Sequence, residues 1–315
     1  MGLAHGAAVG AVVVFFAGIV LSTLIASAAV APFAAYHFHK SQQYAVIANL
    51  IALPVCNIIV MPAALAALIA LPFGHEALPL WVMGWGIEAM VWVAHRVAEI
   101  PGAVLRVPAM PSLAFVFMIA GGLWLMLWQT RWRLLGIALI AGGAALAPTL
   151  RTPDILIGRD AELTAIRGAD GELSAVGATR ASFEFERWLE HDGARRSAEE
   201  ASKSTAFACD GIGCRATVKG MTVAVAQHPA AFAEDCRRAA ILISGLVSPR
   251  GCTAPKTVVD FFAAWRQGTH ALYIEADGSV RIETVAAARG LRPWSMPALP
   301  RLPDAADPRR TAGLQ

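Results

Sequence analysis

The stretch from Ala31 to Met61, APFAAYHFHKSQQYAVIANLIALPVCNIIVM, decides the fold of the first half of the chain. Within it, a short polar loop joins two long apolar runs. The run before the loop, Gly6 to Tyr36, and the run after it, Gln43 to Gly74, contain no charged residue and no His. Each run exceeds the roughly 20 apolar residues that cross a hydrocarbon core about 30 Å thick. The stretch therefore predicts a hairpin of two membrane-spanning helices.

Composition divides the 315 residues into two parts of different character. The chain is 57% hydrophobic with a mean hydropathy of +0.55, which is too apolar for an ordinary soluble enzyme. It holds 26 Lys and Arg and 23 Asp and Glu, but only five and three of these lie in residues 1–150. We therefore expect a membrane α-helical half over 1–150, a small β-rich α+β soluble domain over 151–290 and a disordered tail over 291–315. The nearly neutral soluble half lacks the electrostatic footprint of a nucleic-acid-binding domain.

The membrane half is predicted to hold about four spanning helices. Pro32 is expected to end the first, and Pro54 is expected to kink or break the second near its middle. Val107 to Thr130 and Leu134 to Leu150 are free of charged residues and predict two further spans.

The segment from Trp81 to Ile100 is expected to be an amphipathic interfacial helix. Its polar residues recur at spacings of seven, eight and eleven, which places them on one helical face opposite an apolar one. Three Trp add interfacial rings, which favours a helix in the membrane surface over one that spans it. The polar residues are Glu88, His95, Arg96 and Glu99.

Basic residues predict the orientation in the membrane. Arg131 and Arg133 form the densest basic spot of residues 1–150, and the positive-inside rule puts them on the cytoplasmic side. The chain after Leu150 then emerges on the periplasmic or outer side. The Trp81 to Ile100 segment is expected to lie in the membrane surface and not to cross it. Counting the spans back from Arg131 then puts the Lys40 loop in the cytoplasm as well.

Five polar residues in the first two spans have two interpretations. They either pack helices together, since small and polar side chains hold membrane helices close, or line a water-filled path. They are Ser22, Thr23, Ser27, Asn49 and Asn57. The nearby His37 and His39 are interpreted as interfacial anchors, with a metal site as the alternative.

The soluble half carries four of the five Cys. Short runs such as Ile155 to Gly158 are flanked by turn residues, which predicts strands, and Ala271 to Glu283 is expected to be a hairpin that turns at Asp277 and Gly278. An even set of Cys in an exported domain indicates disulfides, and we favour Cys209 with Cys214 and Cys236 with Cys252 among the three possible pairings. Zinc is the alternative, but the spacing matches no compact finger. Cys56, within a span, is interpreted as a packing residue.

The membrane half resembles the ComEC family of competence proteins. The resemblance lies in ASAAVAPFAAYHFHK (Ala26 to Lys40), ANLIALPV (Ala48 to Val55) and PLWVMGWGIEAM (Pro79 to Met90). It implies the C-terminal part of a channel domain that carries transforming DNA through the cytoplasmic membrane as a single strand. It also implies that this chain is a fragment, with an exported N-terminal domain and several spans missing.

In many members of that family a metallo-β-lactamase-like domain with an HxHxDH metal motif follows. Here only His191, His228 and His270 lie beyond residue 150, and none belongs to such a motif. Residues 151–290 are therefore interpreted as a degenerate, silent version of that domain. We expect no catalytic residue, no metal and no cofactor.

The leading hypothesis is a passive or partner-driven conduit for single-stranded DNA in the bacterial inner membrane. The five polar residues would line the path, and Lys40, Arg131 and Arg133 would meet phosphates on the cytoplasmic side. The expected partners are the DNA strand, the lipid bilayer, other competence proteins and further copies of the chain. The alternatives are an inactive fragment or a membrane-anchored hydrolase, whose candidate ligands or base are Asp154, Asp160, Asp210 and His228.

Overall fold

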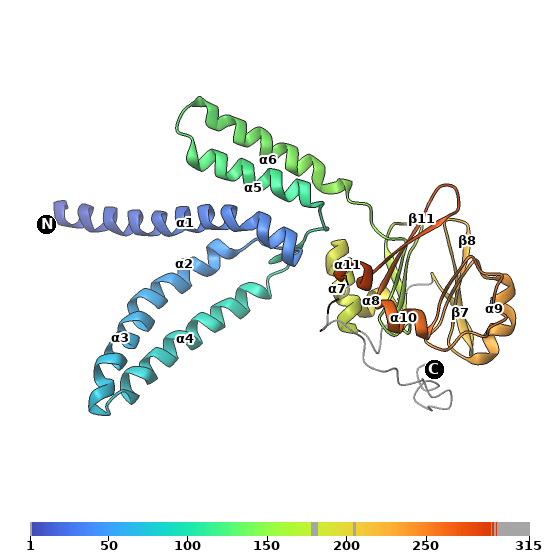
Figure 1. The fold of residues 1–315 in the computed structure, drawn as a ribbon. Helices are drawn as coiled ribbons and strands as arrows, with labels where there is room; N and C mark the ends of the chain where they lie inside the picture. The colour runs from blue at the N-terminus through green and yellow to red at the C-terminus, as the bar shows by residue number, and fades with distance from the viewer. Residues whose placement is uncertain (1, 178–181, 204–205, 291, 293, 295–315) are drawn as a thin grey trace. The chain divides into compact units, whose positions relative to one another are not determined.

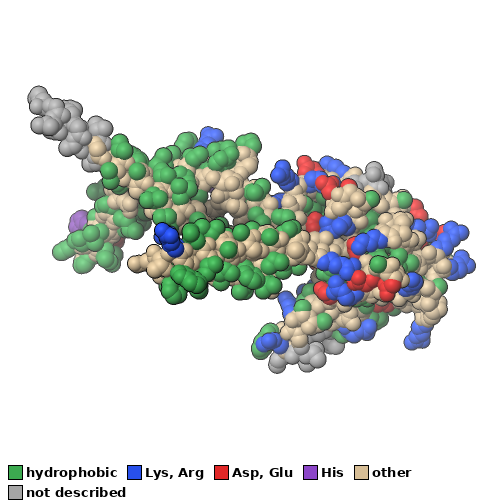
Figure 2. All heavy atoms as spheres, turned by 90° about the horizontal axis from the view of Figure 1, so that it is seen from above, with side chains coloured by type: hydrophobic (Ala, Val, Ile, Leu, Met, Phe, Trp, Pro, Cys, Tyr) green, Lys and Arg blue, Asp and Glu red, His purple; other side chains and the backbone are tan. Residues whose placement is uncertain are grey.

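A computed structural model describes residues 2–177, 182–203, 206–290, 292 and 294. The chain forms two compact units, Met1–Leu150 and Arg151–Gln315. Hydrophobic side chains cover the helices of the first unit, whereas Lys, Arg, Asp and Glu side chains gather on the second (Figure 2). The tail expected to be disordered, 291–315, lies outside the described residues except for positions 292 and 294.

The first unit is helical, as predicted. Its elements are α1 (Gly2–Phe38), β1 (Lys40–Gln42), α2 (Ala45–Val55), a π-helical turn η1 (Cys56–Val60), α3 (Met61–Ala70), η2 (Leu71–Phe73), α4 (Ala77–Ala98), β2 (Val104–Arg106), α5 (Ser112–Leu127), η3 (Arg131–Leu134), α6 (Leu135–Leu146) and η4 (Ala147–Thr149). Within the described residues, four helical segments are long and apolar enough to cross a membrane: Val13–Phe38, Ala45–Phe73, Ala77–Ala98 and Arg131–Thr149.

Two antiparallel helix hairpins organise this unit (Figure 1). In the first, α2, η1 and α3 follow one another along the length of α4. In the second, α5 and α6 lie side by side. The break predicted near Pro54 is confirmed, because the π-helical turn begins at Cys56, two residues later. Proline removes one helical hydrogen bond, and a π-helical turn reorganises the backbone locally.

The prediction that Pro32 ends the first helix was wrong. Helix α1 continues through Pro32 to Phe38. A proline removes a single N–H donor, and membrane helices tolerate this when the surrounding turns keep their hydrogen bonds. The helix ends six residues later, where His39 adopts a φ of +55° and the chain enters β1.

The segment that is predicted to be interfacial, Trp81 to Ile100, packs against other helices of the first unit. Helix α4 packs along α2, η1 and α3, and it is one of the four candidate spans. Its face bearing Gly86 and Val93, seven residues apart, is buried in this hairpin. A Cβ at Gly86 would lie 2.7 Å from Cγ2 of Val60, so the glycine permits the close approach. An amphipathic pattern fits a helix that packs on another helix as well as one that lies on a membrane.

The third predicted span is shorter than the sequence indicated. Val107 to Thr130 was expected to be one helix, but α5 covers only Ser112–Leu127. Pro108 and Pro111 keep the preceding residues out of helical conformation, and Pro111 itself has an extended backbone. At about 1.5 Å per residue, α5 alone is about 24 Å long.

The second unit contains two five-stranded sheets. One has the order β12-β11-β3-β4-β5 and is antiparallel throughout; the other has the order β10-β9-β8-β7-β6, with β9 parallel to both of its neighbours. The first sheet is built from β3 (Ile155–Ile157), β4 (Thr164–Arg167), β5 (Leu173–Val176), β11 (His270–Ile274) and β12 (Val280–Thr284). The second is built from β6 (Ala208–Cys209), β7 (Gly213–Val218), β8 (Met221–Ala226), β9 (Ile241–Ile243) and β10 (Thr257–Val259).

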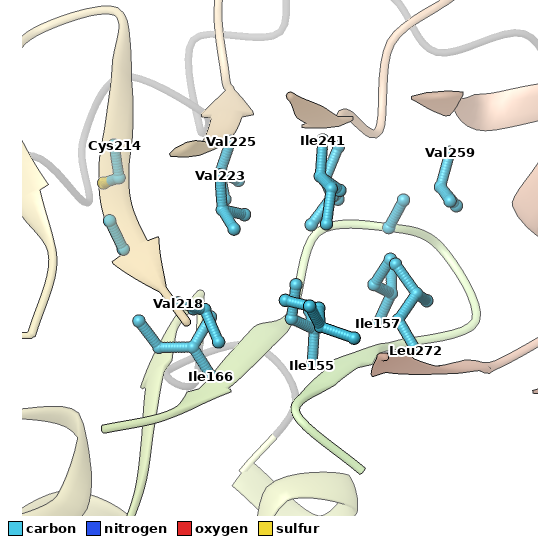
Figure 3. Packing of buried hydrophobic residues seen from close by; sticks show 14 of the residues in the cluster. Ile155, Ile157, Ile166, Cys214, Val218, Val223, Val225, Ile241, Val259 and Leu272 are labelled. Carbon is cyan, nitrogen blue, oxygen red and sulfur yellow. The ribbon is translucent and has the colours of Figure 1, made fainter. Parts of the chain in front are cut away.

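The core of this unit lies between the two sheets. Ile155, Ile166 and Leu272 come from one sheet and meet Val223 and Ile241 from the other (Figure 3). All five side chains are at most 1% exposed. The outer faces are covered by helices: α7 (Ser182–Asp192) and α8 (Ala198–Ser202) pack on the first sheet, and α9 (Phe232–Arg238) packs on the second. Helices α10 (Phe261–Gln267) and α11 (Val285–Arg289) complete the unit.

Turn and cap residues set the bounds of several elements in this unit. The run Thr217 to Ala226 includes the end of β7 and all of β8, which form a hairpin across Lys219 and Gly220, both of which have a positive φ. The run Val258 to Gln267 begins in β10, and α10 starts only after Asp260. The Asp260 side chain accepts a hydrogen bond from Ala263 N and caps that helix.

Candidate functional site

One polar contact joins the first two membrane helices. The Asn49 side-chain amide in α2 lies 3.5 Å from Thr23 Oγ1 in α1, and Thr23 is only 4% exposed. A polar contact between spans is worth about 0.6 kcal/mol on average and at most about 1.7 kcal/mol. These two residues thus act as helix-packing groups in this structure.

The other three candidate path residues have different surroundings. Ser22 Oγ donates to the carbonyl of Ile19 one turn earlier and is exposed, and Ser27 is half-buried. Asn57 lies in the π-helical turn and is exposed. The structure therefore brings together Thr23 and Asn49 alone among the five, and their role in lining a path stays a prediction.

Helix α4 carries an ionisable side chain at its centre. Glu88 is the twelfth of 22 residues, and it is exposed on the face opposite the hairpin contact. Arg96 and Glu99 form an ion pair at the C-terminal end of the same helix. A carboxyl group at mid-span is costly against lipid, so such residues face water or other protein. This face of α4 is thus suited to border a polar passage or another helix.

Lys40, Arg131 and Arg133 are predicted to share one side of the membrane, and the structure separates Lys40 from the two arginines by the length of α5. Strand β1 pairs with β2, which puts Lys40 directly opposite Arg106. Arg106 precedes α5, whereas Arg131 and Arg133 follow it in η3. Lys40 and the η3 arginines therefore lie at opposite ends of the α5–α6 hairpin.

Aromatic side chains mark both ends of this unit. At the ribbon end, the ring of Tyr36 stacks on Phe115 with centroids 4.4 Å apart, which joins α1 to the start of α5. At the other end, Trp124 Nε1 donates to the carbonyl of Trp132 in η3, at 2.9 Å. Aromatic belts at both interfaces are typical of membrane proteins. Because α6 returns antiparallel to α5, the chain leaves this unit at the ribbon end.

The second unit contains two disulfides, and they are the pairs that the sequence analysis favoured. Cys209 is joined to Cys214, and Cys236 to Cys252, while Cys56 is a free thiol. The first links directly paired residues of β6 and β7. The second ties α9 to the connection between β9 and β10, over a small apolar cluster on the outer face of the sheet.

The candidate ligands of a hydrolase have structural roles. Asp154 is buried, lies 2.8 Å from Lys219 Nζ and accepts a hydrogen bond from Ile274 N. The carboxylate of Asp210 accepts from Ile212 N and Gly213 N, and these bonds lower its pKa. His228 and Asp160 lie in turns, where the His228 ring accepts from Ala230 N. Within the described residues, no group of three or more His, Cys, Asp or Glu could hold a metal ion.

His270 is the one fully buried histidine described in this unit. It is 1% exposed, and its Nδ1 donates to the carbonyl of Gly268 at 2.7 Å. Burial disfavours the imidazolium and lowers its pKa. Its Nε2 lies 3.1 Å from the side-chain amide of Gln267. These contacts give the neutral ring a structural role between α10 and β11.

An open pocket of about 520 Å³ lies beside the Asp154–Lys219 pair. Arg151 and Lys219 line it, but Arg151 also lies 2.7 Å from a carboxylate oxygen of Glu275. Both cations are thus matched by acidic groups, and the pocket lacks the excess positive charge that would select an anion.

Comparison with known proteins finds a similarity in the membrane unit. A family model described as "Competence protein" matches residues 5–132, which run from α1 into η3. No curated protein and no solved structure matches the chain. The match does not reach the second unit, so its metallo-β-lactamase-like character stays a prediction. Residues 5–132 are thus similar to the competence protein family, in agreement with the resemblance to ComEC.

Proposed function

We propose that this protein takes up single-stranded transforming DNA across the bacterial inner membrane during natural competence. The observation that carries the proposal is the family match, which covers nearly all of the helical unit. The four candidate spans give that unit the composition of a membrane-embedded domain. The exposed Glu88 at the centre of α4 supports a polar passage beside this helix.

The path would need partners. Few polar residues of this chain line any one helix face, and a strand crossing the bilayer requires polar and cationic contacts along its route. Further competence proteins or additional copies of the chain would supply the remaining helices and the driving force. The Glu88 face of α4, which no helix of the hairpin covers, is where they would join.

We assign the second unit to the periplasmic or outer side. Disulfides persist in oxidising compartments, and two of them stabilise this unit. The ribbon end of the membrane unit then faces outward, and Arg131 and Arg133 face the cytoplasm, in accordance with the positive-inside rule. The second unit acts without catalysis in this proposal, because Asp154 and Asp210 are engaged in structural bonds.

Complementation tests the function. In a competent strain that lacks its own channel protein, we expect the chain, expressed with the partner competence proteins, to restore transformation and the import of labelled DNA. Asn57→Leu should reduce uptake at least tenfold with normal membrane levels, because it removes an exposed amide from the proposed path. Asn49→Leu is the control for packing, since the amide of Asn49 contacts Thr23. This variant should lower the free energy of unfolding of the membrane unit by about 1 kcal/mol. Full protein levels without any uptake would reject the function.

Cysteine labelling tests the orientation. In a Cys56→Ala background, a membrane-impermeant maleimide added outside should modify Arg106→Cys but not Arg133→Cys, because the two positions lie at opposite ends of α5. Lys40→Cys should react like Arg106→Cys, since β1 and β2 hold these positions side by side. Labelling of Arg133→Cys alone would place the second unit in the cytoplasm and contradict the assignment.

A further inference from the structure

Strand β12 is an end strand of its sheet. Among the described residues, it pairs with β11 on one side and is the last strand of the order β12-β11-β3-β4-β5. Ile282, in the middle of β12, is 42% exposed, although it lies directly opposite the fully buried Leu272. An exposed apolar edge strand is a surface on which another strand can pair.

The register with β11 determines which main-chain groups of β12 face the sheet edge. Glu275 N donates to Ser279 O at the start of this ladder, which makes that pair hydrogen-bonded. Hydrogen-bonded and non-hydrogen-bonded pairs alternate along an antiparallel ladder, so Arg281 and Glu283 direct their main-chain groups at β11. The main-chain N–H and C=O groups of Ile282, which lies between them, therefore point away from β11 toward the edge.

The charges of β12 are arranged symmetrically about Ile282. The strand reads Val-Arg-Ile-Glu-Thr from Val280 to Thr284. When two such strands pair antiparallel with Ile282 opposite Ile282, Arg281 of each copy lies opposite Glu283 of the other. These flanking pairs are then non-hydrogen-bonded, the kind in which side chains are closest, and opposite charges across strands stabilise the pairing. Centring the pair on Arg281 or Glu283 would put like charges opposite each other, so the pattern selects one register.

Tyr273 of β11 holds both charged side chains on one face of the sheet. The Arg281 guanidinium lies over the Tyr273 ring, 4.0 Å from its centroid, and the Tyr273 hydroxyl donates to Glu283 at 3.4 Å. Arg281 and Glu283 also form an ion pair within the strand. Side chains that are already held in place lose less conformational entropy on binding. A second copy of β12 would thus meet a preformed set of alternating charges.

We propose that β12 pairs antiparallel with β12 of a second copy of this chain, centred on Ile282, and so joins two second units into a dimer. The self-complementary charge pattern carries the inference, because a two-fold interface presents the same patch twice. Two paired five-residue strands bury less than the roughly 1,600 Å² of a standard interface, so the dimer should be weak in free solution. Two copies anchored in one membrane meet at a higher effective concentration, which favours the pairing. The inference goes beyond the proposed function and does not depend on DNA uptake.

Disulfide cross-linking of the full chain in membranes tests the dimer. In a Cys56→Ala background, Ile282→Cys should form a cross-linked dimer under mild oxidation. The Cα atoms of a hydrogen-bonded pair are about 5.5 Å apart, a distance that a disulfide spans. Glu199→Cys is the matched control, since its side chain is 80% exposed but belongs to α8, which packs on β5 at the other end of the sheet. Equal cross-linking of the two variants would overturn the inference, as would a cross-link from Ile282→Cys to a different protein.

Charge reversal tests the register. Added to the Ile282→Cys chain, Glu283→Arg sets a second cation opposite Arg281 in both symmetric pairs and should lower the yield of cross-linked dimer about fivefold or more. Arg281→Glu should have the same effect. When the two reversed chains carry different tags and share one membrane, cross-linked heterodimers should return to the unreversed yield, because each chain then presents opposite charges to the other. Misfolded chains would not recover on mixing, so a mixture that stays uncross-linked would show that β12 does not pair in this way. The proposed function is tested separately by complementation.

Discussion

Gly121→Ala in α5 is expected to destabilise the membrane unit by about 1–3 kcal/mol, the usual cost of overpacking a tight interface. A Cβ at this position would lie 2.6 Å from the backbone oxygen of Gly136 and 2.8 Å from Ile140 Cγ1. The oxygen belongs to the backbone of α6 and cannot rotate away, so the two helices must separate. The free energy of unfolding can be measured by titrating the reconstituted chain with SDS and following fluorescence, since Trp124 and Trp128 belong to this hairpin.

Gly122→Ala is the matched control. The next residue along α5 has no atom within 4 Å of its hypothetical Cβ. Alanine favours a helix over glycine by up to about 1 kcal/mol, so this variant should be neutral or slightly stabilising. If Gly121→Ala and Gly122→Ala behaved alike, the close packing of α5 on α6 would be wrong.

This interface was missed from the sequence, although a signal was present. Gly136 and Gly143 are seven residues apart and so share one face of α6. A Cβ at Gly143 would lie 2.7 Å from the backbone oxygen of Ala114, and one at Gly136 would lie 2.5 Å from that of Gly121. Small residues at this spacing are typical of membrane helices that pack closely. The neighbouring Gly142, with nothing within 4 Å, shows that glycine alone does not identify the contact.

The spans themselves could be predicted because burial in lipid needs only length and apolar composition. The amphipathic α4 could not be placed in this way, since the same pattern serves a membrane surface or a helix neighbour. The side of the membrane predicted for Lys40 depends on this choice, because each added span reverses the side of everything on one flank of it. Only the pairing of β1 with β2, a contact between residues 62 to 66 positions apart, fixes Lys40 beside Arg106.

In the second unit, a turn could be predicted from the sequence where side chains hydrogen-bond to the residues of the turn. Gly278, with a φ of +75°, and the bonds from Ser279 to Asp277 form the tight turn that the sequence indicated between β11 and β12. The three-residue strand β10 offers too short a pattern to separate strand from helix, and its parallel pairing with β9 depends on distant residues. The pairing of Cys236 with Cys252 follows from the position of α9 on this sheet, which composition does not determine.

Removing the Cys236–Cys252 disulfide by double substitution with alanine is expected to lower the free energy of unfolding of the second unit by about 3 kcal/mol. The bond closes a sequence separation of 16 residues and anchors the segment 244–256, which connects β9 to β10 without a helix. Cys236 and Cys252 also pack against the cluster that contains Phe232 and Leu242. Hydrogen–deuterium exchange of the full chain in nanodiscs under increasing urea measures the effect on peptides from β8 and β9.

The double alanine variant of Cys209 and Cys214 is the internal comparison. It should lower the free energy of unfolding of the second unit by about 2 kcal/mol or less. Its sequence separation is only 5, and the Asp210 carboxylate already holds the turn through Ile212 N and Gly213 N. The loss should appear mainly at β6 and β7, because β6 is an edge strand of two residues. An equal or larger loss than for the Cys236–Cys252 pair would contradict this order. It would show that the edge hairpin, and not the α9 anchor, limits the stability of the second unit.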